Sequence, residues 1–243
     1  MAAGSQPMPY SEARMVDSGA QTLETLEGAD RYNRWIFERI RAGLGRRVLE
    51  IGCGTGTITQ FLVDRDLVVG VDVSPEYVLT AATRCRAHAN VLIQLQDITK
   101  SIEGLRQYRF DSAVSANVFE HIEDDSRAMA AVFELLEPGG TFSLLVPSHP
   151  FLMSPFDRAI GHYRRYTMAG LRGKLEAAGF RVDAIRRSNP IGAIGWAVNN
   201  CLLRRGRLGG VGIYDRLVPT LSWLDRRVEP AIGLSLTARA TKV

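Results

Sequence analysis

Cysteine is scarce in this chain, and the three cysteines present, Cys53, Cys85 and Cys201, fit no metal-binding spacing of the C-x-x-C kind. An odd number of cysteines also argues against a disulfide framework. No apolar run approaches the roughly 18 residues of a membrane-spanning helix, and the first thirty residues lack the basic start and apolar core of a signal peptide. We therefore expect free thiols in a reducing compartment and a cytoplasmic protein.

The net charge of +4 conceals an uneven distribution of charge along the chain. Residues 1–149 carry 14 Lys and Arg against 20 Asp and Glu, a net charge of −6, whereas residues 150–243 carry 16 against 6, a net charge of +10. The basic C-terminal third would attract an anionic substrate, a nucleic acid or an acidic membrane surface, or it is an ordinary solvated surface. Composition alone leaves these alternatives open.

Residues 1–28 mix Gly, Ser, Pro and Gln with few apolar residues, which is typical of a flexible or lid-like arm. The hydrophobic content of 46% is ample for one core, so we predict a single domain over residues 29–243. Its first element is an amphipathic helix with Asp30 as the N-cap and apolar residues at helical spacing from Tyr32 to Ile40.

Short apolar segments then alternate with helical patterns, which favours a parallel sheet covered by helices on both faces, because parallel strands need crossover connections. The predicted strands span residues 47–51, 67–71, 91–96, 111–115, 141–146, 180–185 and 234–240. The predicted helices between them span residues 57–64, 75–87, 126–136 and 167–178. Residues 188–233 are too long for an ordinary connection and are predicted to form a helical cap insertion or an interface before the last strand.

A glycine-rich turn follows the first predicted strand, in the segment V-L-E-I-G-C-G-T-G-T that begins at Val48. Glycines permit positive φ and the close approach of a ligand, and the N-terminus of the following helix presents unpaired N–H groups. A dinucleotide fingerprint needs G-x-G-x-x-G/A, but the third glycine here, Gly56, falls one residue early, which weakens a dehydrogenase interpretation. The turn therefore predicts a site for a nucleoside-containing ligand.

The segment E-I-G-C-G-T-G resembles the first motif of class I S-adenosylmethionine-dependent methyltransferases, and the resemblance covers most of residues 30–185. It implies an α/β fold with a Rossmann-like seven-stranded methyltransferase sheet, mostly parallel with the last strand antiparallel. It also implies S-adenosyl-L-methionine as the cofactor and S-adenosyl-L-homocysteine as its product. The implied cofactor-binding residues are Glu50, Gly52, Cys53, Gly54, Gly56, Asp72, Val73, Asp97, Ile98, Asn117 and Tyr32.

Residues at successive strand ends have separate parts in this resemblance. Asp72 would hold the ribose hydroxyls, since a carboxylate accepts from two vicinal hydroxyls at once. Asp97 would accept from the adenine amine, and Ile98 would supply an apolar contact. Asn117 would lie beside the methionine part, while Tyr32 would close over the cofactor or belong to an ordinary packing stripe. Open α/β sheets bind ligands at such strand ends.

The residues after the fourth predicted strand include E-H-I, which resembles a segment of members related to quinone-type O-methyltransferases. His121 is the first candidate for a general base because the ordinary pKa of imidazole lies near working pH, and Glu120 would orient it or bind the substrate. The alternative is a helix-start histidine satisfied by neighbouring backbone. Some relatives bind a divalent metal through E-x-x-E-H, but Asn117 occupies the first acidic position here, so we expect no metal.

The segment G-H-Y-R-R-Y-T, which begins at Gly161, resembles the G-H-x-R-R-Y-T motif of one methyltransferase subgroup. His162 is a second candidate base, and the forked donors of the two arginines suit a carboxylate or phosphate. The alternative is that one arginine braces the loop and the other faces water. The predicted substrate-binding residues are Arg164, Arg165, Tyr166 and Trp196.

The sequence therefore favours an S-adenosylmethionine-dependent methyltransferase that methylates an oxygen or nitrogen of a small molecule, anionic or hydrophobic, in biosynthetic tailoring. One alternative is RNA methylation, which the basic C-terminal third favours although no RNA-binding module is recognised. Another is a repurposed, noncatalytic protein that binds the cofactor. Nucleic acid is not the expected partner, whereas a homodimer and peripheral contact of the apolar, basic insertion with a membrane stay open.

Overall fold

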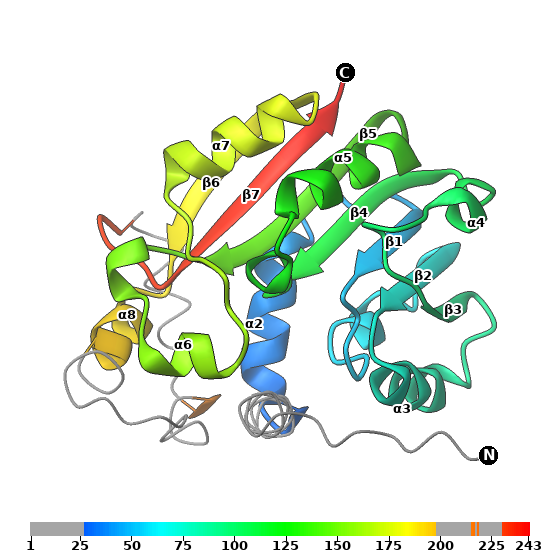
Figure 1. Cartoon of the computed structure of the whole chain (residues 1–243). Coiled ribbons are helices and arrows are strands. Elements are labelled where there is room, and N and C mark those ends of the chain that lie inside the picture. Colours follow the sequence, from blue (N-terminus) through cyan, green and yellow to red (C-terminus); the bar gives the residue numbers. More distant parts are fainter. Residues whose placement is uncertain (1–26, 198–214, 217, 219–229) are drawn as a thin grey trace, which may run out of the picture.

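The structure of the chain is a computed structural model that describes residues 27–197, 215, 216, 218 and 230–243. Within them, seven strands form one sheet in the order β3-β2-β1-β4-β5-β7-β6 (Figure 1). The strands are β1 (Arg47–Ile51), β2 (Leu67–Asp72), β3 (Val91–Leu95), β4 (Phe110–Ala116), β5 (Leu136–Pro147), β6 (Phe180–Ser188) and β7 (Ser235–Lys242). Strand β7 is antiparallel to β5 and β6, which confirms the predicted fold class.

Helices cover both faces of the sheet, as its parallel connections require. Helix α2 contacts β4, β5 and β7 on one face, whereas α5 and α7 cover the other (Figure 1). The α-helices are α2 (Asp30–Ile40), α3 (Pro75–Cys85), α4 (Glu103–Arg106), α5 (Asp125–Leu135), α6 (Pro155–Ala159), α7 (Met168–Ala177) and α8 (Pro190–Trp196). The short 3-10 helices are η1 (Thr59–Phe61), η2 (Phe119–His121) and η3 (Pro150–Leu152).

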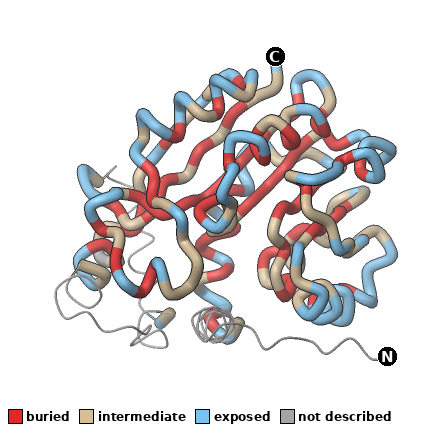
Figure 2. Tube along the Cα trace, in the orientation of Figure 1, coloured by how far each residue is buried: buried red, intermediate tan, exposed pale blue. Residues whose placement is uncertain are grey.

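Side chains that alternate along the strands form one hydrophobic core on each face. Leu49 and Ile51 of β1 belong to the core that includes α5 and α7, whereas Val48 packs with Trp35 and Ile40 of α2. The central strands are therefore buried on both faces (Figure 2). Their buried ends provide a rigid base for the loops that follow β1, β2 and β4.

Two local predictions are wrong. Instead of the helix predicted over residues 57–64, the chain forms only the short 3-10 helix η1. Residues 57–59 are three consecutive β-branched residues, whose restricted side-chain rotamers disfavour an α-helix. The first helix has Ala29 as its N-cap, so Asp30 is its first helical residue, where a negative charge is still favourable.

Several predictions fall partly on residues that the structure does not describe. The predicted arm, residues 1–28, is described only at 27 and 28, and Cys201 lies outside the described residues. Of the predicted insertion, residues 188–233, the structure describes α8 and its flanks, residues 215, 216 and 218, and the approach to β7. Cys53 and Cys85 are buried free thiols. In the described part of the chain, each helix falls short of the length and apolarity needed to cross a membrane.

Helix α6 is a short helix that the sequence analysis missed. It begins with a capping box, in which the Asp157 N–H donates to Ser154 Oγ at 3.2 Å and the Ser154 N–H donates to Asp157 Oδ2 at 2.7 Å. The sequence S-P-F-D, which begins at Ser154, is typical of such a helix start, because it combines a capping box with proline at the first helical position. Helices α6 and α8 lie beyond the end of the sheet toward which the arrows of β4 and β5 point (Figure 1).

Candidate functional site

The turn after β1 holds its three glycines in left-handed backbone conformations. Gly52, Gly54 and Gly56 have φ values of 68°, 53° and 82°, which residues with a Cβ rarely adopt. The Gly52 N–H donates to the Val71 carbonyl at 2.8 Å, which ties the turn to β2. A Cβ at Gly52 would lie only 2.3 Å from the side chain of Val118, beyond β4. The turn is therefore held tightly between the ends of β2 and β4.

Asp72 ends β2 beside this turn. Its carboxylate accepts from the backbone N–H groups of Gly54 at 2.9 Å and Ser74 at 3.0 Å, which fixes its orientation, and each oxygen keeps lone pairs for another donor. The next side chain, Val73, is 67% exposed and offers an apolar surface. These residues fit the predicted cofactor, because Asp72 suits the ribose hydroxyls and Val73 suits the apolar face of adenine.

The two residues predicted to follow the third strand are engaged in contacts within the protein. Asp97 accepts from the Thr99 N–H and hydroxyl at 2.9 and 2.6 Å, and it pairs with Lys100 Nζ at 3.1 Å. Ile98 is 5% exposed and packs in the core that includes α5. Their contact with adenine stays a prediction, and Ile98 has little surface left for it.

Glu50 places a carboxyl group inside the protein next to the glycine turn. The residue is 3% exposed, and its Oε2 has no hydrogen-bond partner among the described residues. The hydroxyl of Thr55 in the turn is likewise buried without a partner in that part of the chain. Burial is the main cause that raises the pKa of Glu50 to about 8. The polar part of a ligand could give the Glu50 carboxyl and the Thr55 hydroxyl the hydrogen-bond partners that buried polar atoms usually have.

Replacing Glu50 by Gln should stabilise the cofactor-free protein at alkaline pH. Because the pKa of Glu50 is raised from 4.5 to about 8 in the folded protein, the folded state binds more protons than the unfolded state, and stability falls as pH rises between these values. Gln keeps the shape of the side chain but does not ionise. We expect Glu50→Gln to raise Tm by ~3–6 °C at pH 8.5 and by much less at pH 5.

Thermal unfolding at pH 5, 7 and 8.5 checks this expectation. Glu76→Gln is the matched control, because Glu76 is exposed on α3. A Tm difference for Glu50→Gln that stays constant across the three pH values would show that the ionisation of this carboxyl does not limit stability.

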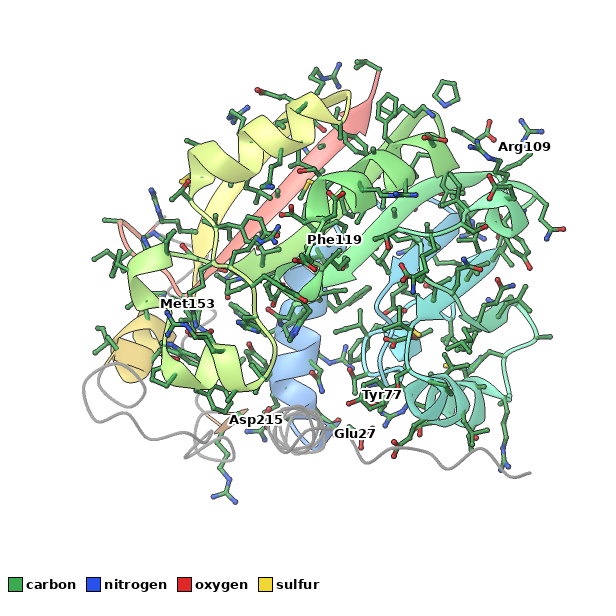
Figure 3. All side chains as sticks on the ribbon, viewed as in Figure 1. Glu27, Tyr77, Arg109, Phe119, Met153 and Asp215 are labelled. Carbon is green, nitrogen blue, oxygen red and sulfur yellow. The ribbon has the colours of Figure 1, made fainter. Side chains whose placement is uncertain are left out.

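Asn117 lies between the glycine turn and a second group of residues. It follows β4 with a φ of 55°, which is uncommon for a residue other than glycine and typical of functional sites. Its N–H donates to the Leu145 carbonyl at 2.8 Å. The next residue, Val118, packs at Gly52, and η2 begins immediately afterwards. Phe119, the first residue of η2, is labelled in Figure 3.

The three predicted catalytic residues, Glu120, His121 and His162, lie together although they come from different segments. Glu120 and His121 end η2, whereas His162 follows α6. The rings of His121 and His162 meet edge to face with centroids 4.6 Å apart. His162 Nε2 lies 3.9 Å from Glu120 Oε1. The structure thus forms a Glu-His-His cluster, and its Glu120 follows two residues after Val118, which packs at the glycine turn.

Asp157 of α6 fixes the orientation of His162. Its Oδ1 lies 2.9 Å from His162 Nδ1 and also accepts from Arg165 Nε and Nη2 at 3.1 and 2.7 Å. Burial would raise the pKa of Asp157, but the bonds from His162 and Arg165 lower it to about 2, so the group is an ionised acceptor. Nδ1 of His162 therefore carries a proton, and Nε2 faces Glu120. No sequence motif marked this aspartate, which only the folded chain brings to His162.

Glu120 is the most enclosed member of the cluster. It is 1% exposed, and neither carboxyl oxygen has a hydrogen-bond partner among the described residues. Burial raises the pKa of Glu120 to about 7, against an opposing effect of nearby His162. Burial and then the charge of Glu120 raise the pKa of Tyr32 to about 12. Helix α2 therefore contributes Tyr32 to the surroundings of Glu120, with the Tyr32 ring stacked on Trp35 at 5.6 Å.

His121 lies at the exposed side of the cluster. Burial of the ring by surrounding protein atoms, and then the nearby His162, lower the pKa of His121. Part of the residue is exposed to solvent, which limits this effect. The backbone of Gly161 and Ile160 beside the ring acts in the opposite direction. A Cβ at Gly161 would lie 3.7 Å from His121 Nδ1, so this ring nitrogen is turned toward the loop after α6.

Two predicted substrate-binding residues brace the loop that carries His162. Arg165 is 6% exposed, bonds to Asp157 and donates to the Ser148 carbonyl at 3.2 Å. Its guanidinium lies 4.7 Å from the centre of the Trp196 ring. Trp196 Nε1 donates to the Leu152 carbonyl at 3.2 Å, which joins α8 to η3. Contact of Arg165 and Trp196 with a substrate stays a prediction.

The other two predicted substrate-binding residues converge on Asp125, the first residue of α5. Tyr166 is 4% exposed and donates to Asp125 Oδ2 at 2.7 Å, while Arg164 Nη1 and Lys174 Nζ lie 2.5 and 2.7 Å from Asp125 Oδ1. Arg164 also donates to the Glu123 carbonyl at 2.6 Å. These contacts fix both residues within the protein, and their contact with a substrate stays a prediction.

Residues 48–140 match the model of a family described as a methyltransferase domain. The ubiquinone biosynthesis O-methyltransferase of Pseudomonas fluorescens (strain SBW25) is 30% identical over 108 residues, which cover 44% of this chain and 46% of that protein. The chain thus spans about half the length of the curated relatives it matches.

Two solved structures have the same fold. An S-adenosylmethionine-dependent methyltransferase from Mesorhizobium loti has a TM-score of 0.59 at 20% identity, and the likeness covers 89% of this chain and 100% of that one. Phosphoethanolamine N-methyltransferase 2 of Haemonchus contortus, solved with S-adenosyl-L-methionine, has a TM-score of 0.59 at 19% identity, with coverage of 87% and 52%. At these identities the likeness concerns the fold.

The family match covers the strands whose ends carry the glycine turn, Asp72 and Asn117. The sheet order and the antiparallel last strand are those of a Rossmann-like methyltransferase sheet. Residues 48–140 are thus similar to a methyltransferase domain, and the fold is that of a solved S-adenosylmethionine-dependent methyltransferase.

Proposed function

We propose that the whole chain is a methyltransferase that transfers the methyl group of S-adenosylmethionine to an oxygen or nitrogen of a small molecule. The observation that carries this proposal is the packing of Gly52 in the cofactor turn against Val118, two residues before Glu120. This packing supports the proposal because it connects the glycine turn with the segment that leads to the Glu-His-His cluster. The partial likeness to an O-methyltransferase supports an oxygen acceptor.

Two groups of residues would have separate roles in the reaction, one in cofactor binding and one in proton removal. Gly52, Gly54 and Asp72 would hold the cofactor, which when bound supplies an electrophilic methyl group. Much of the rate of such a displacement comes from holding donor and acceptor in line. The Glu-His-His cluster would accept the proton that an acceptor hydroxyl or ammonium group must lose.

His162 has the geometry of a base in the metal-free protein. Because its Nδ1–H donates to ionised Asp157, its Nε2 has a lone pair available for a proton. Once Nε2 is protonated, the positive ring is held between Asp157 and Glu120, which lies 3.9 Å from Nε2. This arrangement stabilises the imidazolium in place and would favour proton removal from the acceptor.

Calorimetric titration of the purified full-length protein tests the proposal. S-adenosylmethionine and S-adenosylhomocysteine should bind, and a nicotinamide dinucleotide should not. Incubation with methyl-labelled cofactor and a panel of phenols, catechols and amines should then transfer label to one class of acceptor. Absence of binding for both sulfur nucleosides would reject the cofactor assignment, whereas transfer of label only to RNA would reject the small-molecule acceptor.

A further inference from the structure

The Glu-His-His cluster has the composition of a metal site. Among the described residues, Glu120, His121 and His162 each offer one ligand atom, and these atoms all lie within 4.8 Å of one another. A small adjustment of side chains would bring such atoms to the separations found around one ion, since Zn²⁺ binds nitrogen and oxygen ligands at about 2.0–2.2 Å. The cluster thus offers one carboxylate and two imidazoles to a common point.

One ring nitrogen of His162 is directed at a carboxylate, and one ring nitrogen of His121 lies beside the backbone of Gly161. Nδ1 of His162 donates to Asp157 over 2.9 Å, and Nδ1 of His121 is turned toward the backbone at Gly161. Histidines that bind metals almost always direct their second ring nitrogen to a carboxylate or a backbone carbonyl in this way, which fixes the ring and leaves the first nitrogen for the ion. Nε2 of His162, which faces Glu120, is therefore its ligand atom, and the proposal assigns the same atom to His121.

Glu120 provides an independent observation. Its side chain is buried, with 1% exposure of the residue, yet both carboxyl oxygens lack a hydrogen-bond partner in the described part of the chain. His162 Nε2 is 3.9 Å from Glu120 Oε1, which is beyond hydrogen-bond distance. Burying a carboxyl group without hydrogen bonds is costly, and carboxylates found in protein interiors are paired or bind metals. A cation bound between Glu120 and the two Nε2 atoms would remove this cost.

We propose that Glu120, His121 and His162 bind one divalent transition-metal ion, with Zn²⁺ preferred over Mg²⁺. Two imidazoles and one carboxylate suit Zn²⁺, whereas Mg²⁺ prefers an all-oxygen octahedral shell. Asn117 is not needed as a ligand, because His162 supplies the third position from the loop after α6. This ligand set differs from E-x-x-E-H, in which carboxylates predominate and all ligands come from one short segment.

Three protein ligands leave a fourth position for an acceptor hydroxyl, and this part of the inference rests on the proposed function. Coordination would lower the pKa of that hydroxyl, so that its proton passes to water. The oxygen electron pair then forms the bond to the methyl carbon, and the carbon–sulfur pair returns to sulfur to give S-adenosylhomocysteine. With the ion bound, His162 is a ligand rather than the base.

Metal binding to the full-length protein tests the proposal without any assay of activity. After treatment with a chelator, the wild-type protein should bind one Zn²⁺ per chain in a calorimetric titration, and Mg²⁺ should bind at least 100-fold more weakly. Co²⁺ should give the visible absorption of a site with nitrogen and oxygen ligands. Glu120→Gln and His162→Gln should each weaken Zn²⁺ binding by about 10–100-fold or more, and Asp157→Asn by about 10–100-fold.

His88→Gln is the control, because His88 is exposed on a different segment. Circular dichroism of each variant separates loss of the site from loss of the fold. Absence of stoichiometric Zn²⁺ binding, or equal Zn²⁺ affinity in wild type and in folded Glu120→Gln and His162→Gln, would overturn the proposal. S-adenosylmethionine binding to the metal-free protein is measured in parallel, so failure of the metal site is distinguished from failure of the proposed methyltransferase function.

Discussion

Replacing Asp72 by Ala should weaken the binding of S-adenosylmethionine by at least ~100-fold. The substitution would remove the proposed acceptor for the two ribose hydroxyls, a carboxylate that Gly54 and Ser74 hold by their N–H groups. A hydrogen bond to a charged group contributes about 1.5–3 kcal/mol, so the loss of two such bonds corresponds to two or more factors of ten in affinity. Calorimetric titration of the purified variant measures the effect.

Asp64→Ala is the matched control for this experiment. Asp64 is also an acidic residue near β2, but its side chain is 71% exposed and lies at the opposite end of the strand from Asp72. It should bind the cofactor as the wild type does. If folded Asp72→Ala retained wild-type affinity, the carboxylate would not contact the ribose, and the assignment of the strand end after β2 would be wrong.

Replacing His162 by Ala should lower the rate of methyl transfer by about 10²–10⁴-fold while cofactor binding stays nearly unchanged. Whether His162 acts as the base or as a metal ligand, the proton of the acceptor would no longer be removed efficiently. His162 bonds to Asp157 of α6, whereas Asp72 bonds to Gly54 of the glycine turn. Its loss should therefore affect the chemical step more than the affinity for cofactor.

Single-turnover measurements with a labelled cofactor separate the two effects. His88→Ala should transfer the methyl group at the wild-type rate. A His162→Ala variant that binds cofactor and methylates the acceptor at the wild-type rate would exclude His162 from both roles, and His121 would then be the remaining histidine of the cluster to test.

The strands of the sheet could be predicted from the sequence because the apolar pattern of a strand depends only on residues that are close together in the chain. Apolar segments between helical patterns gave the strands, and the order of glycine turn, Asp72 and Asn117 along the chain placed them at strand ends that the structure confirms. The helix predicted over residues 57–64 was wrong because it was inferred from the fold type. The β-branched residues there favour a shorter turn.

Side-chain direction could not be read from the motifs. G-H-Y-R-R-Y-T marked Arg165 and Tyr166 as substrate residues, yet tertiary packing buries them against Asp157 and Asp125. Asp157 itself escaped notice because a single aspartate before a histidine carries no signal until α6 positions it. The expectation of no metal rested on the residues around Asn117 and stays a prediction, and the fold adds His162 to Glu120 and His121.

The contact between Gly52 and Val118 has a consequence for how ligands influence one another. The side chain of Val118 fills the space that a Cβ at Gly52 would need. The glycine turn and the segment that leads to Glu120 are therefore packed directly against each other. We therefore expect a ligand that shifts one segment to shift the other, which would link the occupancy of the two regions thermodynamically. Such linkage is reciprocal: the factor by which an ion or acceptor changes cofactor affinity equals the factor by which cofactor changes theirs.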